Sequence, residues 1–181
     1  MDGIQPRLGK LVPWRGVMSK PSRLLAAAAA ATMLSLPASA QGVLTERNIS
    51  LGLAMTIAQS ALESCRANGF HVSVTVVDRA GQVRVALRDD NASPHTFENS
   101  QRKAYTARTF RVPSAEFATR MAGDPVKAQL VLPGVIALAG ALPIKVGDEI
   151  IGAVGVSGAP GGEKDEACAK TGIDKVADQL K

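Results

Sequence analysis

The sequence predicts an α+β domain in which helices pack on a five-stranded antiparallel sheet. Apolar residues that recur every three or four positions mark helices, and short runs of alternating or continuous apolar residues mark strands. These segments follow in the order helix, two strands, two helices, three strands and helix. The strands are joined mainly by short turns, which connect antiparallel rather than parallel neighbours.

The first 40 residues are interpreted as a secretory signal peptide, which leaves a domain over residues 41–181. Lys20 and Arg23 precede an apolar run over residues 24–36, and an A-x-A pattern ends just before Gln41. The run is too short to cross a bilayer as a helix. Met18 is an alternative start of this leader. We therefore expect a periplasmic or extracellular protein with no membrane span after cleavage.

The charge of the chain lies largely in this leader. Five of the 21 basic residues and one of the 16 acidic residues fall in residues 1–40, so the rest of the chain is nearly neutral. The sequence pI of about 9.5 therefore gives no support for nucleic-acid binding. The full chain of 181 residues, 46% of them hydrophobic, is long enough to bury one core.

Both cysteines of the chain, Cys65 and Cys168, remain after cleavage. Export would place them in an oxidising compartment, where a Cys65–Cys168 disulfide can form. It forms only if the first and last helices are neighbours with their Cβ atoms about 4 Å apart. Two buried free thiols are the alternative.

The first helix is expected to begin after Thr45 and to end at Asn68-Gly69, a left-handed cap. Strands over 70–78 and 82–88 follow, joined by a hairpin turn. His71 falls on the more polar face of its strand, so we expect it to face solvent or a partner rather than a ligand.

The second helix is predicted from Pro94, with Ser93 as N-cap, to residues 110–112, because Pro113 follows. It carries the densest group of polar side chains in the sequence. One flank holds a histidine, an amide, a guanidinium and a hydroxyl at spacings of four, three and four, namely His95, Asn99, Arg102 and Thr106.

The second half of the domain is expected to contain a short helix, three strands and a final helix. Ser114 is predicted to cap the short helix, which ends near Met121. The final helix follows a glycine-rich loop. The predicted strands cover residues 134–140, 142–146 and 149–157, the loop covers 158–162, and the final helix covers 163–180.

Several short motifs in this order resemble the GlcG/HbpS-like family, which includes the C-terminal domain of PduO. The resemblance covers about residues 44–181. The motifs are Asp78-Arg79-Ala80-Gly81, Arg88-Asp89-Asp90-Asn91-Ala92, Lys103-Ala104-Tyr105-Thr106-Ala107, Pro143-Ile144 and the run Ile151-Gly152-Ala153-Val154-Gly155-Val156-Ser157-Gly158.

The resemblance implies an α/β sandwich with a five-stranded antiparallel sheet that assembles into homo-oligomers. Several members bind haem, and exported members have been linked to haem capture and redox sensing. Iron ligation in the family is attributed to a threonine in one member and a histidine in another. The Lys-Ala-x-Thr-Ala motif carries the threonine over to Thr106, whereas no comparable motif surrounds His95.

The residues themselves also fit a haem site, which needs an axial donor, an apolar slot and cations for the propionates. His95 offers an imidazole that Asp89 or Asp90 could orient. Arg102 and Lys103 offer cations for carboxylates. The aromatic side chains of the same helix, Phe97, Tyr105 and Phe110, are candidate apolar walls. The alternative is a surface helix with solvated basic residues and core aromatics.

The loop over 158–162 precedes a helix N-terminus, where backbone N–H groups can bind an anion. The acidic residues that begin the helix favour a plain turn instead. Ser157 lacks the G-x-S-x-G pattern of a serine hydrolase.

The sequence thus predicts an exported, oligomeric small-molecule-binding protein for haem or a related tetrapyrrole, acting in uptake, storage or redox sensing. The alternative is an enzyme for a small carboxylate or aromatic metabolite. In that case Arg102 or Lys103 would hold the anion, while His95 or Asp90 would move a proton. A structural accessory without a ligand is a third interpretation.

Overall fold

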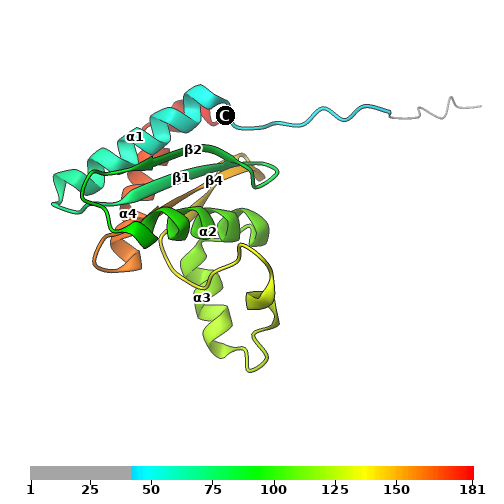
Figure 1. Ribbon diagram of the computed structural model, residues 1–181. Coiled ribbons are helices and arrows are strands. Elements are labelled where there is room, and N and C mark those ends of the chain that lie inside the picture. Colours follow the sequence, from blue (N-terminus) through cyan, green and yellow to red (C-terminus); the bar gives the residue numbers. More distant parts are fainter. Residues whose placement is uncertain (1–41) are drawn as a thin grey trace, which may run out of the picture. The chain divides into compact units, whose positions relative to one another are not determined.

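A four-stranded antiparallel sheet of order β2-β1-β4-β3 is the middle layer of the fold (Figure 1). The structure is a computed structural model that describes residues 42–181, so the predicted signal peptide lies outside the described residues. The strands are β1 (Ser73–Asp78), β2 (Val83–Arg88), β3 (Ala141–Val146) and β4 (Glu149–Ser157). The predicted α+β class with an antiparallel sheet is confirmed.

Helices cover both faces of the sheet (Figure 1). Helices α1 (Leu51–Ala67) and α4 (Gly162–Asp174) lie side by side on one face, and α2 (Pro94–Phe110) lies on the other, followed by α3 (Ser114–Gly123). Two short 3-10 helices complete the chain, η1 (Ala128–Val131) and η2 (Ala177–Gln179).

Strand β1 is buried along its whole length because both of its faces are covered. Val74 and Val76 point into the main core beneath α1 and α4. The opposite face meets α2 through hydroxyl pairs as well as apolar contacts. Ser73 Oγ lies 2.8 Å from Thr96 Oγ1, and Thr75 Oγ lies 2.8 Å from Ser100 Oγ. These hydrogen bonds fix α2 on the sheet.

The fifth strand predicted over residues 134–140 is wrong. This segment is irregular, and its backbone bonds partly to side chains of α2 instead of a neighbouring strand. Gly134 and Gly140, at its two ends, have φ of 80° and 127°, which a regular strand does not adopt. The segment therefore covers part of α2, and β3 forms that edge of the sheet.

Several element boundaries also differ from the prediction. Helix α1 begins at Leu51 rather than after Thr45, because the Ser50 hydroxyl accepts the Leu53 N–H at 3.2 Å. Strand β1 begins at Ser73, three residues later than predicted. Helix α4 ends at Asp174, so the predicted helix to residue 180 was too long.

Helices α1 and α4 are joined by a disulfide between Cys65 and Cys168, whose Cα atoms are 5.5 Å apart. The two half-cystines are buried in the main core. No helix within residues 42–181 is long and apolar enough to cross a membrane.

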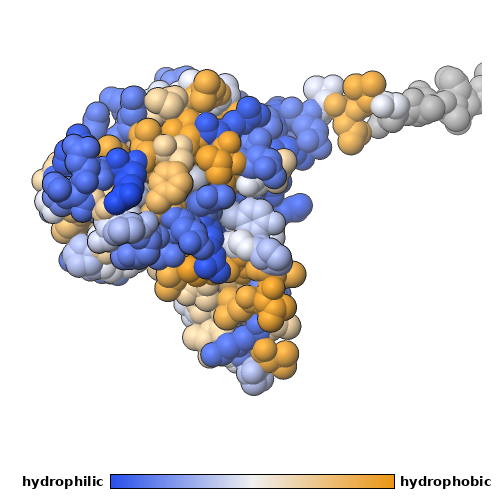
Figure 2. Space-filling model, in the orientation of Figure 1, coloured by the Kyte–Doolittle hydropathy of each residue, from blue (hydrophilic) through white to orange (hydrophobic). Residues whose placement is uncertain are grey.

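Exposed apolar side chains gather on the loop after α3, where Val126 and Val131 are 77% and 81% exposed. Figure 2 shows hydrophobic colour over this protruding part of the domain. Leu130 of this loop packs against the core cluster around Phe117, whereas Val126 and Val131 belong to no core cluster of the described residues.

Candidate functional site

Thr106 is fully buried on α2. Its hydroxyl donates to the Arg102 carbonyl at 2.8 Å and accepts the Ile136 N–H at 3.0 Å. A threonine hydroxyl can donate one hydrogen bond and accept two. These two bonds therefore occupy its only donor and one of its two acceptor positions. Thr106 therefore holds the irregular segment against α2 in this structure.

Arg102 has a similar role. Its Nη2 donates to the Val135 carbonyl at 2.9 Å, and its Nη1 lies 3.5 Å from Glu98 Oε1. Together with Thr106, this guanidinium anchors the start of the segment that the sequence had predicted as a strand.

Lys103 is a buried cation that is paired within the protein. Its Nζ donates to Asp165 Oδ2 at 2.8 Å and to the Val156 carbonyl at 3.0 Å. Asp165, at the start of α4, also accepts the Ala159 N–H through Oδ1. Burial raises the pKa of Asp165 despite the neighbouring ammonium. No local pattern indicates this pair, because its members are 62 positions apart in the chain.

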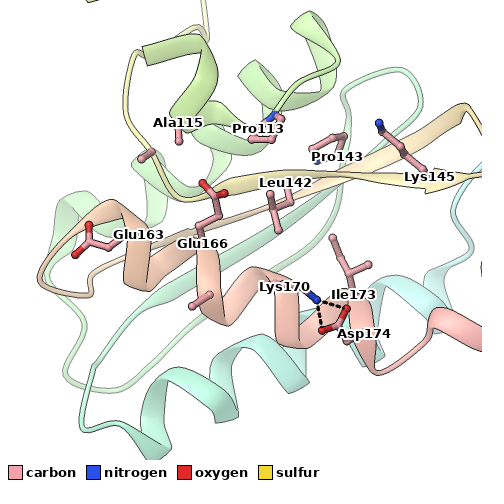
Figure 3. A pocket seen from close by; sticks show the side chains of 12 residues that line it. Pro113, Ala115, Leu142, Pro143, Lys145, Glu163, Glu166, Lys170, Ile173 and Asp174 are labelled. Carbon is pink, nitrogen blue, oxygen red and sulfur yellow. Dashed lines mark hydrogen bonds and ion pairs between the residues drawn. The ribbon is translucent and has the colours of Figure 1, made fainter. Parts of the chain in front are cut away.

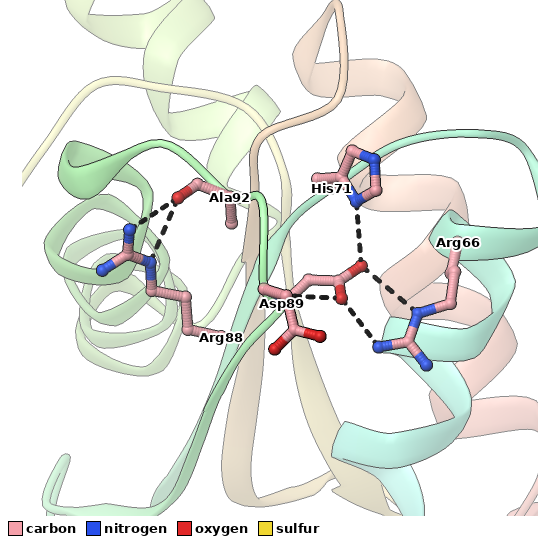
Figure 4. Close-up of polar contacts among 6 residues, drawn as sticks. Arg66, His71, Arg88, Asp89 and Ala92 are labelled. Carbon is pink, nitrogen blue, oxygen red and sulfur yellow. Dashed lines mark hydrogen bonds and ion pairs between the residues drawn. The ribbon is translucent and has the colours of Figure 1, made fainter.

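His95 lies exposed in the first turn of α2 and has no hydrogen-bond partner within residues 42–181. The expectation that Asp89 orients it is wrong. Asp89 instead accepts from Arg66 at 2.7 and 3.3 Å and lies 3.3 Å from His71 Nδ1 (Figure 4). The bonds from Arg66 lower the pKa of Asp89 to about 2. Asp90 is exposed.

Two of the predicted aromatic walls are parts of the core instead. Phe110 stacks on Phe117 with ring centroids 4.3 Å apart, and Tyr105 packs against the same cluster. Only Phe97 of the three is exposed, at 41%.

A pocket of about 290 Å³ brings His95 and Lys103 together between the starts of α2 and α4 and the end of β4. Thr106 and Arg102 line neither this pocket, nor the groove between β3 and α4, nor the pocket beside Arg79 and Arg108. The predicted site residues therefore divide into a pocket pair, His95 and Lys103, and a structural pair, Arg102 and Thr106.

A larger groove of about 710 Å³ lies between β3, α4 and the start of α3 (Figure 3). Its lining is mainly apolar, and the charged residues are two lysines, Lys145 and Lys170, and three acids, Glu163, Glu166 and Asp174. Burial raises the pKa of Glu166. The sequence analysis missed this groove because its residues come from three elements far apart in the chain. The apolar lining residues are Pro113, Ala115, Ala139, Leu142, Pro143, Ala167 and Ile173.

The described residues contain no group of three or more His, Cys, Asp or Glu side chains that could hold a metal ion. An antiparallel sheet between helical layers, with an apolar groove beside a polar pocket, defines a small α+β domain suited to binding a small molecule.

The chain belongs to the HbpS-like family, because the family model described as "Haem degrading protein HbpS-like" matches residues 49–174. The family predicted from the sequence motifs is thus confirmed. The chain is also 32% identical to Protein GlcG of Escherichia coli strain K12 over 109 residues, which cover 60% of this chain and 81% of that relative.

Solved structures agree with this assignment. A double mutant of Streptomyces reticuli HbpS is 36% identical with a TM-score of 0.69, over 73% of this chain and 89% of that one. A PduOC:heme complex is 23% identical with a TM-score of 0.65, over 71% and 94% of the two chains. At that identity the PduOC likeness shows the fold alone.

Proposed function

We propose that this protein is exported and binds haem or a related tetrapyrrole, in haem uptake, storage or redox sensing. The observation that carries the proposal is the match to a family described as haem-degrading and HbpS-like. The haem complex of PduOC supports it as an example of the same fold with that ligand. The disulfide between α1 and α4 suits an oxidising compartment outside the cytosol.

The described residues fit haem in part. The larger groove offers an apolar surface, with Lys145 available to a propionate, whereas Lys170 is already paired with Asp174. His95 offers an uncommitted imidazole in the neighbouring pocket. Thr106 would first have to release Ile136, because its hydroxyl is already bonded. When bound, haem would supply a redox-active iron. We expect a homo-oligomer, which a native mass would test.

The enzymatic alternative is not favoured by these contacts. Arg102 is bonded to the Val135 carbonyl, and neither Arg102 nor Asp90 lines the pocket that holds His95 and Lys103.

Haemin titration tests the proposal. The purified protein should develop a saturable Soret band at stoichiometric haemin, and His95→Ala should weaken binding about tenfold or more because iron loses its axial nitrogen. His71→Ala is the matched control, since it removes the other histidine, which contacts Asp89. The proposal fails if the wild type shows no spectral change at stoichiometric haemin.

Thr106 needs a variant that separates ligation from folding. Thr106→Val should cost about 1–3 kcal/mol of unfolding free energy, because the Ile136 N–H loses its acceptor. Thr106→Ser keeps that acceptor and should stay close to wild type in urea unfolding. A folded Thr106→Val protein with an unchanged Soret band would exclude Thr106 as the iron ligand.

A further inference from the structure

We propose that the pocket beside His95 is a distinct binding site for a carboxylate group. It lies where the end of β4 and the loop over 158–161 meet the first turns of α2 and α4. Neither the family description nor the names of the relatives assign a ligand to it.

The first observation is the Ser157 hydroxyl. Ser157 ends β4, is only 4% exposed and lines the pocket. Its hydroxyl has no hydrogen-bond partner within residues 42–181, although it is not sealed from the pocket. Because this hydroxyl is unpaired among the described residues and open to the pocket, it is free to donate to a polar group that binds there.

The second observation is the uneven pairing of Lys103 and Asp165. An ammonium has three N–H donors, and the structure uses two of them. Both carboxylate oxygens of Asp165 already accept, one from Lys103 and one from Ala159. The pair therefore presents a spare donor to the pocket rather than a spare acceptor.

The rest of the lining is also rich in donors. His95 and Ser93 lie at the rim, and the side chain of Ser93 makes no capping bond. The Lys164 and Asp165 amides bond to the Gly161 carbonyl, which leaves the Gly162 and Glu163 amides, at the positive end of the helix dipole, without a backbone acceptor in the described part of the chain. Thr96 adds no free donor, because its hydroxyl donates to the Ser93 carbonyl. Donors thus outnumber acceptors, which favours an anion.

The size and charge of the pocket define the class of anion. About 290 Å³ accommodates a small group and not a macrocycle. Asp165 neutralises most of the Lys103 charge, and the exposed Glu163 adds negative charge at the start of α4. A singly charged carboxylate is therefore favoured over a doubly charged phosphate, which these acids would repel more strongly.

Two molecules can supply this carboxylate. One is a free small carboxylate. The other is the propionate of a tetrapyrrole in the larger groove, since Ala139 lines both cavities. Only the second source rests on the proposed function.

Sodium propionate is the probe for the first source. In amide NMR spectra of the full domain, it should cause saturable shifts at Ser157, Gly158 and Ala159, whereas uncharged propionamide should not. Ser157→Ala should weaken propionate binding about tenfold, the effect of one charge-assisted hydrogen bond. Ser60→Ala is the matched control, a partly buried serine on α1 outside the pocket. Equal shifts with propionate and propionamide would overturn the proposal, as would unchanged binding in Ser157→Ala.

Haemin and its dimethyl ester distinguish the second source. If a propionate occupies the pocket, the ester should bind the wild type about tenfold more weakly, and Ser157→Ala should remove that difference. Equal binding of haemin and ester, together with saturable propionate shifts, assigns the pocket to a free carboxylate. If haemin does not bind at all, the proposed function fails while the propionate titration still decides the pocket. Absence of both propionate shifts and an ester effect would overturn the inference.

Discussion

Asp89 is a buried carboxylate at the end of the β1–β2 hairpin, where it ties the turn before α2 to α1. Arg66 approaches both of its oxygens, and the Asp90 N–H donates to Oδ1 at 2.9 Å. Next to it, Arg88 donates to the Ala92 carbonyl at 2.7 and 3.1 Å and closes the turn itself (Figure 4). These contacts make the Arg-Asp-Asp motif a structural support for the start of α2.

The lowered pKa of Asp89 predicts a pH dependence of stability. Its folded pKa of about 2 lies below the ordinary value of 3.8, so Asp89 stabilises the fold above pH 3.8. That contribution should be lost as the pH falls from about 4 through about 2. Asp89→Asn should flatten this part of the curve in urea unfolding measured from pH 7 to pH 2. Asp90→Asn, an exposed neighbour, should leave it unchanged, and an equal effect of both substitutions would contradict the assignment.

Single residues also show how far the sequence could be used for prediction. The start of α2 at Pro94 and its end at Phe110 follow from local rules, because proline fixes both ends of that segment. The pairing of Lys103 with Asp165 and that of Asp89 with Arg66 depend on distant elements meeting in the fold. Residue type alone marked Lys103 as a cation, but not its partner.

At the level of elements, the contact between α2 and β4 depends on Gly155. A Cβ built on Gly155 would collide with the Ser100 carbonyl and would come within 2.7 Å of the Ala104 N. The helix therefore lies directly on the backbone of the strand. This close approach requires a residue without a Cβ at this position of β4.

Gly155→Ala is therefore expected to destabilise the protein by about 1–3 kcal/mol, because α2 must move off the sheet. Gly52→Ala is the control, because a Cβ at this exposed position in α1 meets nothing within 4 Å. This variant should be as stable as the wild type or more stable by up to about 1 kcal/mol, because alanine favours the helix over glycine. Urea unfolding of both variants measures the difference. Similar stability of the two variants would show that α2 does not require the glycine.

The irregular segment over 134–140 illustrates what local patterns miss. Its small and apolar residues are typical of a strand. No residue within the segment indicates that the side chains of Thr106 and Arg102 form hydrogen bonds with its backbone. The predicted fold class is nevertheless correct, because the other four strands and their hairpins define an antiparallel sheet.

For the whole molecule, the disulfide is the longest covalent constraint. It joins residues 103 positions apart, so it removes much of the freedom of the unfolded chain. Reduction should cost about 2–5 kcal/mol of unfolding free energy, measured by urea unfolding with and without reductant. The Cys168→Ser variant should be equally weakened and should no longer respond to reductant. A wild type insensitive to full reduction would contradict this expectation.

The same disulfide has a consequence for proteolysis. The protruding loop around Val126 and Val131 is exposed and lies between the two half-cystines in the chain. A protease that cuts there would leave two fragments still linked by the bond from α1 to α4. The cut protein would migrate as one molecule until a reducing agent released its halves.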